Sequence, residues 1–65
     1  MRFAIGQAFE SIVDGRRAVV AQIRDGGRAG LLRFLDNGRE QWFLWPQFHH
    51  EGRWLPIGIM KQAAN

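Results

Sequence analysis

Short apolar runs alternate along this chain with clusters of glycine, aspartate and asparagine. The turn signals lie about 11 to 14 residues apart, at Asp14-Gly15, Asp25 to Gly27, Asn37-Gly38 and Glu51-Gly52. Asp-Gly and Asn-Gly turns between short β-branched and aromatic runs are typical of antiparallel strands joined by hairpins. No window carries a sustained 3.6-residue apolar stripe with helix caps, so the pattern predicts no long helix.

The pattern predicts five strands and one short helical turn. The strands are expected at Gln7–Val13, Arg17–Arg24, Gly30–Asp36, Glu40–Pro46 and Arg53–Ile57. The segment PQFHHE has the length of a single 3₁₀ turn before the last strand. Because closing such a sheet removes most free edges, we expect an all-β fold, a small five-stranded antiparallel SH3-like barrel. The barrel is expected over residues 1–60, followed by a flexible C-terminal tail at residues 61–65.

The strongest hairpin signal is Asn37-Gly38, because a type I′ turn needs positive φ at both central residues and Asn-Gly tolerates this best. A two-residue loop there places Arg33 opposite Trp42, where we expect a cross-strand cation–π stack. Directly opposed residues share a face, and a slip of one residue exchanges the two faces. The apolar face is assigned to the core and holds Leu32, Phe34, Phe43 and Trp45. The mixed face is assigned to the outside and holds Leu31, Arg33, Leu35, Glu40, Trp42 and Leu44.

The first hairpin allows two pairings. A two-residue loop at Asp14-Gly15 pairs Val13 with Arg16, whereas a three-residue loop pairs Val13 with Arg17 and aligns Phe9 with Ala21. We favour the longer loop, because it gathers one apolar face from Phe9, Val19, Ala21 and Ile23.

The run Leu32-Arg33-Phe34-Leu35-Asp36-Asn37-Gly38 resembles the third strand and turn of Tudor-type SH3-like domains. Gln47-Phe48 is similar to the polar–apolar pair that follows their fourth strand. The resemblance covers about a third of the chain and implies a barrel. Tudor cages for methylated side chains place aromatic residues where this chain has Asn37 and Arg16-Arg17. The resemblance is therefore carried over for the fold and not for the ligand.

The charge balance is nine basic residues against six acidic ones, a net charge of +3, and every basic residue except Lys61 is arginine. The planar fork of arginine suits phosphate, carboxylate and aromatic stacking. A GC-rich genome explains the same bias, and the net charge is mild for a nucleic-acid-binding protein.

The composition disfavours catalysis. The chain has no cysteine, threonine or tyrosine, and Ser11 is its only hydroxyl residue, so nucleophilic catalysis is not expected. His49, His50 and Glu51 are consecutive, which is a poor geometry for a metal site. We therefore expect no enzyme, no cofactor and no metal. Without a long apolar run, we expect no membrane segment and a cytoplasmic location.

Eight aromatic residues exceed what so small a core is expected to hold, so Trp42 and Trp54 are assigned to the surface. Aromatic residues and arginine are enriched at protein interfaces, and the outer leucines favour contact with protein. The leading prediction is a non-catalytic interaction module that binds a protein partner or a second copy through the outer face of the Arg33–Trp42 hairpin. Its predicted binding residues are Arg24, Arg33, Arg53, Trp42, Trp54 and Leu44.

The alternative function is nucleic-acid binding. In that case bases stack on the exposed aromatic rings and arginines meet the phosphates. The arginines assigned to phosphate are Arg16, Arg17, Arg24, Arg33, Arg39 and Arg53.

The assigned faces predict that Trp45 is more buried than Trp42. In variants whose only tryptophan is Trp42 or Trp45, iodide should quench the fluorescence of Trp42 more strongly. Stronger quenching of Trp45 would contradict the assignment.

Overall fold

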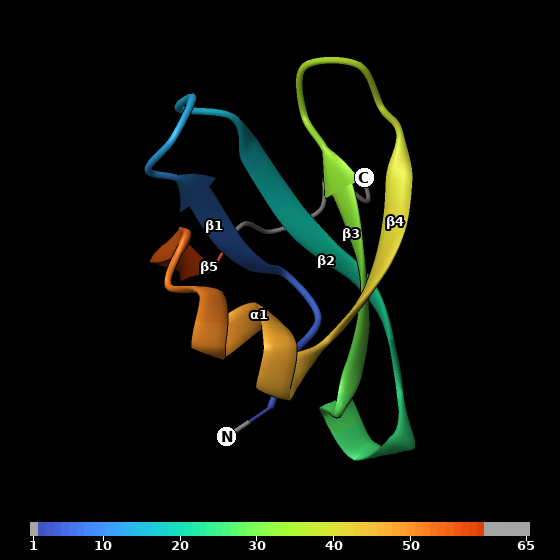
Figure 1. Ribbon diagram of the computed structural model, residues 1–65. Helices are drawn as coiled ribbons and strands as arrows, with labels where there is room; N and C mark the ends of the chain where they lie inside the picture. Colours follow the sequence, from blue (N-terminus) through green and yellow to red (C-terminus); the bar gives the residue numbers. More distant parts are fainter. Residues whose placement is uncertain (1, 60–65) are drawn as a thin grey trace.

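The computed structural model describes residues 2–59, which form one antiparallel sheet, a short α-helix and a 3₁₀ turn (Figure 1). The strands are β1 (Gln7–Ser11), β2 (Arg17–Arg24), β3 (Ala29–Phe34), β4 (Glu40–Leu44) and β5 (Trp54–Ile59). The 3₁₀ turn η1 covers Asp25–Gly27, and α1 covers Trp45–Glu51. The expected tail at residues 61–65 lies outside the described residues.

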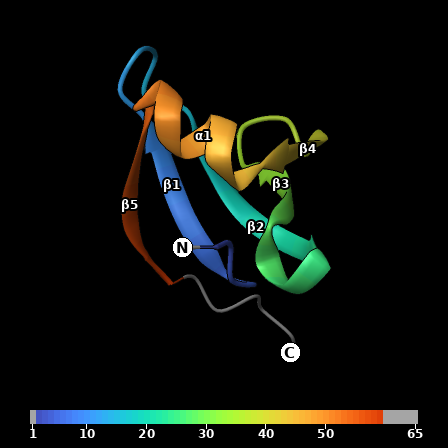
Figure 2. The same ribbon diagram turned by 60° about the horizontal axis from the view of Figure 1, so that its bottom comes forward.

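The strand order in the sheet is β4-β3-β2-β1-β5 (Figure 1). Four strands therefore follow one another as hairpins, and β5 returns to pair with β1. Figure 2 shows α1 lying across one face of this sheet, on the way from β4 to β5. The prediction of an all-β fold with five antiparallel strands is confirmed. We call the face covered by α1 the inner face and the opposite face the outer face.

The segment predicted as a 3₁₀ turn is instead an α-helix that begins at Trp45. Pro46 lies in its first turn, where a missing N–H costs no intrahelical bond. Gly52 ends the helix at φ 64°, with its N–H donating to the carbonyl of His49 at 3.2 Å. Trp45 therefore reaches the core from the helix and not from a strand. It is half-buried and Trp42 is 37 % exposed, so the expected order of burial is confirmed.

The second hairpin has a four-residue loop, residues 35–38, in place of the expected type I′ turn. Only Gly38 has positive φ, and its N–H donates to the carbonyl of Phe34 at 2.8 Å. The longer loop shifts the register by two positions, so Arg33 lies opposite Glu40 and Leu31 opposite Trp42. The expected stack of Arg33 on Trp42 is therefore wrong. An even shift keeps every side chain on its face, so Leu32, Phe34 and Phe43 still turn inward.

The first hairpin uses the same four-residue loop, here residues 12–15. The N–H of Gly15 donates to the carbonyl of Ser11, as that of Gly38 does to Phe34. Phe9 pairs with Ala18 and not with Ala21, a displacement of three positions. An odd displacement exchanges the faces. The predicted apolar face was therefore wrong, and the residues that join Phe9 in the core are Ala18 and Val20.

The core lies between the inner face of the sheet and α1. It consists of Phe3, Phe9, Ala18, Val20, Leu32, Phe34 and Phe48, with Phe43, Trp45 and Trp54 packed against it. The ring of Phe48, which comes from α1, lies 4.9 Å from Phe9, 5.0 Å from Phe3 and 5.6 Å from Trp54 between ring centroids. Edge-to-face and offset aromatic pairs at such distances add to the stabilisation from burial.

Phe3 belongs to the core although it precedes β1. Its N–H donates to the carbonyl of Gly27 at 2.7 Å, and Gly6 N–H donates to the carbonyl of Val20 at 2.8 Å. The Phe3 ring lies over Gly30, where a Cβ atom would come within 2.7 Å of two ring atoms. Glycine at the second position of β3 is therefore required by this contact.

Gly30→Ala should lower the free energy of unfolding by about 1–3 kcal/mol, because the added methyl group overpacks the core against Phe3. Urea denaturation of Gly30→Ala, Phe3→Leu and the double variant measures the coupling between the two positions. Leucine at position 3 should relieve part of the clash. The loss of unfolding free energy in the double variant should therefore be smaller than the sum of the losses in the two single variants. Full stability of Gly30→Ala would contradict the packing described.

Candidate binding surface

Trp42 is the one aromatic residue that is absent from the aromatic core. The other seven aromatic residues of the chain are core residues or pack against them. Trp42 lies on the outer face of β4, and the guanidinium carbon of Arg24 sits over its ring, 4.1 Å from the ring centroid. This geometry is a cation–π contact that reaches from β2 across β3 to β4 on the outer face.

The Arg24–Trp42 contact is part of a larger apolar surface. Arg24 pairs with Ala29, and Ala29 pairs in turn with Leu44, while Leu31 pairs with Trp42. Ala29 and Leu31 are buried, whereas Leu44 is 51 % exposed. We call this set, Arg24, Ala29, Leu31, Trp42 and Leu44, the Trp42 patch. In this patch, the buried side chains of Ala29 and Leu31 lie beneath the exposed Leu44, the indole of Trp42 and the guanidinium of Arg24.

Arg24 reaches the patch because β2 contains a bulge. The register of β2 against β3 shifts between Val20 and Gln22, so Ala21 has no partner in the ladder. Val20 is a core residue, and regular alternation would turn Gln22 and Arg24 inward as well. The extra residue reverses the alternation and places Arg24 on the outer face. The sequence carries no plain signal for this bulge.

The structure brings together Arg24, Trp42 and Leu44 among the predicted binding residues. Arg33 lies next to them on the outer face, where its Nη2 atom is 2.8 Å from a carboxylate oxygen of Glu40. Arg53 lies elsewhere, directly after α1 and Gly52. Trp54 was wrongly assigned to the surface, since its half-buried ring stacks on Phe48 at an interplanar angle of 12°.

Trp54 contributes to a groove of about 510 Å³ between α1 and β5. Its aromatic lining residues are Phe9, Trp45, Phe48 and Trp54, and Arg2 and His49 are the basic residues that line it. The volume falls in the range of small-molecule sites, roughly 300–1,000 Å³. The sequence pattern gives no sign of this groove, because the groove depends on α1, where the pattern predicts only a 3₁₀ turn.

Three of the arginines assigned to phosphate are paired with carboxylates. Arg17 contacts Glu10 at 3.0 Å, and Arg33 contacts Glu40 as described. Arg16 binds Asp36 with two hydrogen bonds, of 3.0 and 3.2 Å, and its guanidinium also lies 4.3 Å from the centroid of the Phe34 ring. These pairs neutralise part of the positive charge of the sheet.

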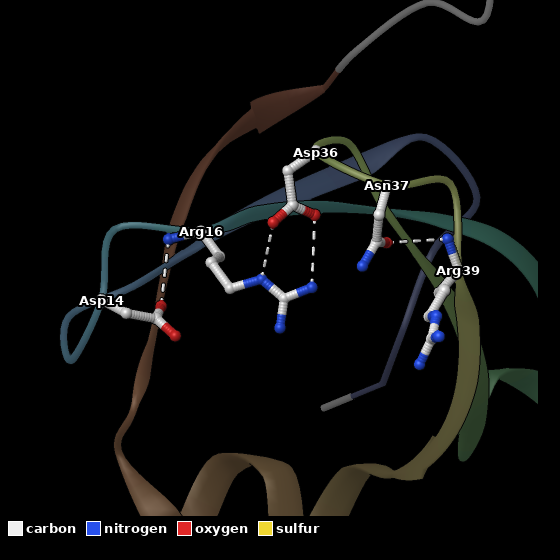
Figure 3. A network of polar contacts seen from close by, with 5 residues as sticks. All are labelled: Asp14, Arg16, Asp36, Asn37 and Arg39. Atoms are coloured by element: carbon white, nitrogen blue, oxygen red, sulfur yellow. Dashed lines mark hydrogen bonds and ion pairs between the residues drawn. The ribbon is translucent and has the colours of Figure 1, made fainter.

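The Arg16–Asp36 pair joins the two hairpin loops (Figure 3). Each loop has the same internal contact, because Asp14 accepts a hydrogen bond from the backbone N–H of Arg16 and Asn37 accepts one from that of Arg39. The hydrogen bonds from Arg16 hold the pKa of Asp36 below its usual value. The backbone N–H of Arg16 is the largest cause of the lowered pKa of Asp14. This network fixes the loops.

The described residues offer little for a metal site. His49 stacks on Trp45, with 5.7 Å between ring centroids. Within residues 2–59, no group of three His, Cys, Asp or Glu side chains is arranged to hold a metal ion. No helix in the same range has the length and apolar character needed to cross a membrane.

Arg16→Gln should raise the pKa of Asp36 toward its usual value of 3.8. The pKa of Asp14 should move less, because its main partner is a backbone N–H that the substitution keeps. A carboxyl whose pKa is lowered by folding stabilises the protein above its unfolded pKa, and this stabilisation is lost as the pH falls through the folded pKa. Wild-type stability should therefore decline more than that of Arg16→Gln between pH 5 and pH 2.

Carboxyl chemical shifts measured by NMR across a pH titration would give both pKa values, and urea denaturation at each pH would give the stability. An unchanged pKa of Asp36 in Arg16→Gln would show that this ion pair does not form in solution.

Comparison with protein families, curated proteins and solved structures gives no match for this chain. The residues and their geometry are therefore the basis on which a function is assigned.

Proposed function

We propose that this chain is a non-catalytic interaction module, a small SH3-like barrel that docks a protein partner on the Trp42 patch. The observation that carries the proposal is the position of Trp42. Seven aromatic residues gather around the core, and the eighth lies on the outer face under a guanidinium and beside an exposed leucine. The SH3-like arrangement is supported by the strand order β4-β3-β2-β1-β5 and by α1, which connects the two edge strands, and the sheet stays open between β4 and β5. A cytoplasmic location is part of the proposal.

The chemistry of the patch favours a protein partner. Tryptophan and arginine are the residues that most often dominate the binding energy of protein interfaces. Arg24 and Trp42 hold each other in place before binding, so little side-chain entropy remains to be lost. Leu44 extends the contact with an apolar surface that gains free energy when a partner covers it. The complementary surface is therefore apolar.

Nucleic acid has less support as the ligand. A base needs an open ring on which to stack, and Arg24 already covers one face of the Trp42 ring. Arg16, Arg17 and Arg33 have carboxylate partners that phosphate would have to displace.

A matched pair of charge reversals tests the proposal. Arg24→Glu removes the cation of the patch, and Arg53→Glu makes the same change in charge outside it. Wild-type protein immobilised on a resin should retain a protein, or a second copy of itself, with an affinity that Arg24→Glu and Trp42→Ala reduce about tenfold or more. Arg53→Glu should bind like the wild type.

Salt dependence separates the two ligand classes in the same experiment. Binding through the apolar patch should persist as salt rises, whereas phosphate binding should weaken steeply. Equal loss of the retained protein in Arg24→Glu and Arg53→Glu would contradict docking at the Trp42 patch. A fluorescence titration with random single-stranded DNA at low salt should show no strong binding.

A further inference from the structure

The outer edge of β4 carries backbone groups that no strand within residues 2–59 pairs with. Phe34 N–H donates to the carbonyl of Arg39, and Trp45 N–H donates to the carbonyl of Arg28, both at 2.8 Å. In an antiparallel pair, every second residue of a strand points its N–H and C=O groups at the partner strand. Because residues 39 and 45 both bond toward β3, residues 41 and 43 point their backbone groups toward β3 as well. Glu40, Trp42 and Leu44 consequently direct their N–H groups away from β3, at the open edge. Their side chains lie on the outer face.

The two edges of the sheet differ in how they are protected. β5 contains Pro56, which has no N–H, and Gly58 at φ 128°, and its register against β1 is interrupted by a bulge. Proline, glycine and bulges are the features that keep an edge strand from pairing with another chain. β4 has the sequence EQWFL and contains none of them. Its one charged side chain, Glu40, is matched by Arg33 within the same sheet.

We infer that β4 pairs antiparallel with β4 of a second copy, about a two-fold axis at Trp42. The inference rests on the proposed function and names the partner of the Trp42 patch as this chain itself. A two-fold interface brings the same surface of each copy together, and an edge strand can meet that requirement in the antiparallel orientation. The register centred on Trp42 is the one that pairs the whole of β4, with Glu40 opposite Leu44 of the second copy.

This register satisfies the backbone and the side chains together. Trp42 exchanges both of its outward backbone hydrogen bonds with Trp42 of the second copy, because outward-facing residues form the hydrogen-bonded pairs. The two indoles then lie side by side on the outer face, and the two Trp42 patches form one continuous surface. Leu44, which is 51 % exposed in the single chain, comes next to the second copy. Glu40 keeps its own Arg33, so the carboxylate that lies opposite Leu44 of the second copy stays paired with a cation.

Size-exclusion chromatography with light scattering over a concentration series tests this pairing. Two variants at one position separate edge pairing from packing of the outer faces. Trp42→Ala and Trp42→Pro both remove the indole, but only Trp42→Pro also removes the outward N–H, and neither changes the hydrogen bonds between β3 and β4. We expect a wild-type dimer, a dimer weakened roughly tenfold in Trp42→Ala, and a folded monomer for Trp42→Pro.

Amide hydrogen exchange of the wild type gives a second readout that needs no substitution. On dimerisation the amides of Glu40, Trp42 and Leu44 should gain protection, and those of β5 should not. This readout stands if Trp42→Pro fails to fold. A wild-type monomer at every concentration, a dimer that forms equally in both variants, or a dimer without added protection at these three amides overturns the inference.

The outcomes also separate this inference from the proposed function. A monomer that still binds another protein, with an affinity lowered by Arg24→Glu, overturns the second copy as the partner and leaves docking at the patch intact. A dimer with protected β4 amides that no substitution of Arg24 or Leu44 weakens supports the edge pairing and contradicts the role of the patch.

Discussion

The packing of one ring from α1, that of Phe48, holds the rest of the structure together. It contacts Phe3 from the N-terminal segment, Phe9 from β1, Phe43 from β4 and Trp54 from β5. A chain of 65 residues buries a smaller share of its surface than a larger domain does, and it has no cysteine with which to form a disulfide. Large rings supply the apolar area that such a core needs. The core takes every aromatic residue except Trp42. The position of Trp42 on the outer face is therefore not explained by packing of the core.

Much of the fold could be predicted from the turn signals, and the errors have a common physical origin. The strands lie where the Asp-Gly and Asn-Gly spacing places them, and β2 has the predicted bounds. The loop type was misjudged because Asn37 does not adopt positive φ, and Gly38 alone turns the chain. At the second hairpin the observed register differs from the predicted one by two positions, which leaves each side chain on its predicted face. Leu32 and Phe34 are therefore core residues, as predicted. At the first hairpin the register differs by three positions, which exchanges the faces. The valine that packs with Phe9 in the core is therefore Val20 and not Val19.

The candidate surface could be predicted only in part, because it depends on distant constraints. Alternation along β4 was enough to place Trp42 and Leu44 outside. The partner of the indole was not predictable, since Arg24 replaces Arg33 through a bulge in another strand. Trp54 was misplaced because α1 offers it the ring of Phe48, and a seven-residue helix is too short to show an apolar period in the sequence. Pro46 and Gly52 mark its ends and were the available signal.

The pairing of β5 with β1 joins segments from opposite ends of the described chain, and this has a consequence for the order of folding. The hairpins close over short loops at small entropic cost, whereas bringing β5 to β1 encloses everything between them. Contacts of such long sequence separation slow folding. The strands β1 to β4 can therefore meet before β5 pairs with β1, and until then Phe48 lacks Trp54 as a ring neighbour. A folding chain would pass through a stage in which the inner face of the sheet is formed and only partly covered, and this is the stage most exposed to wrong association.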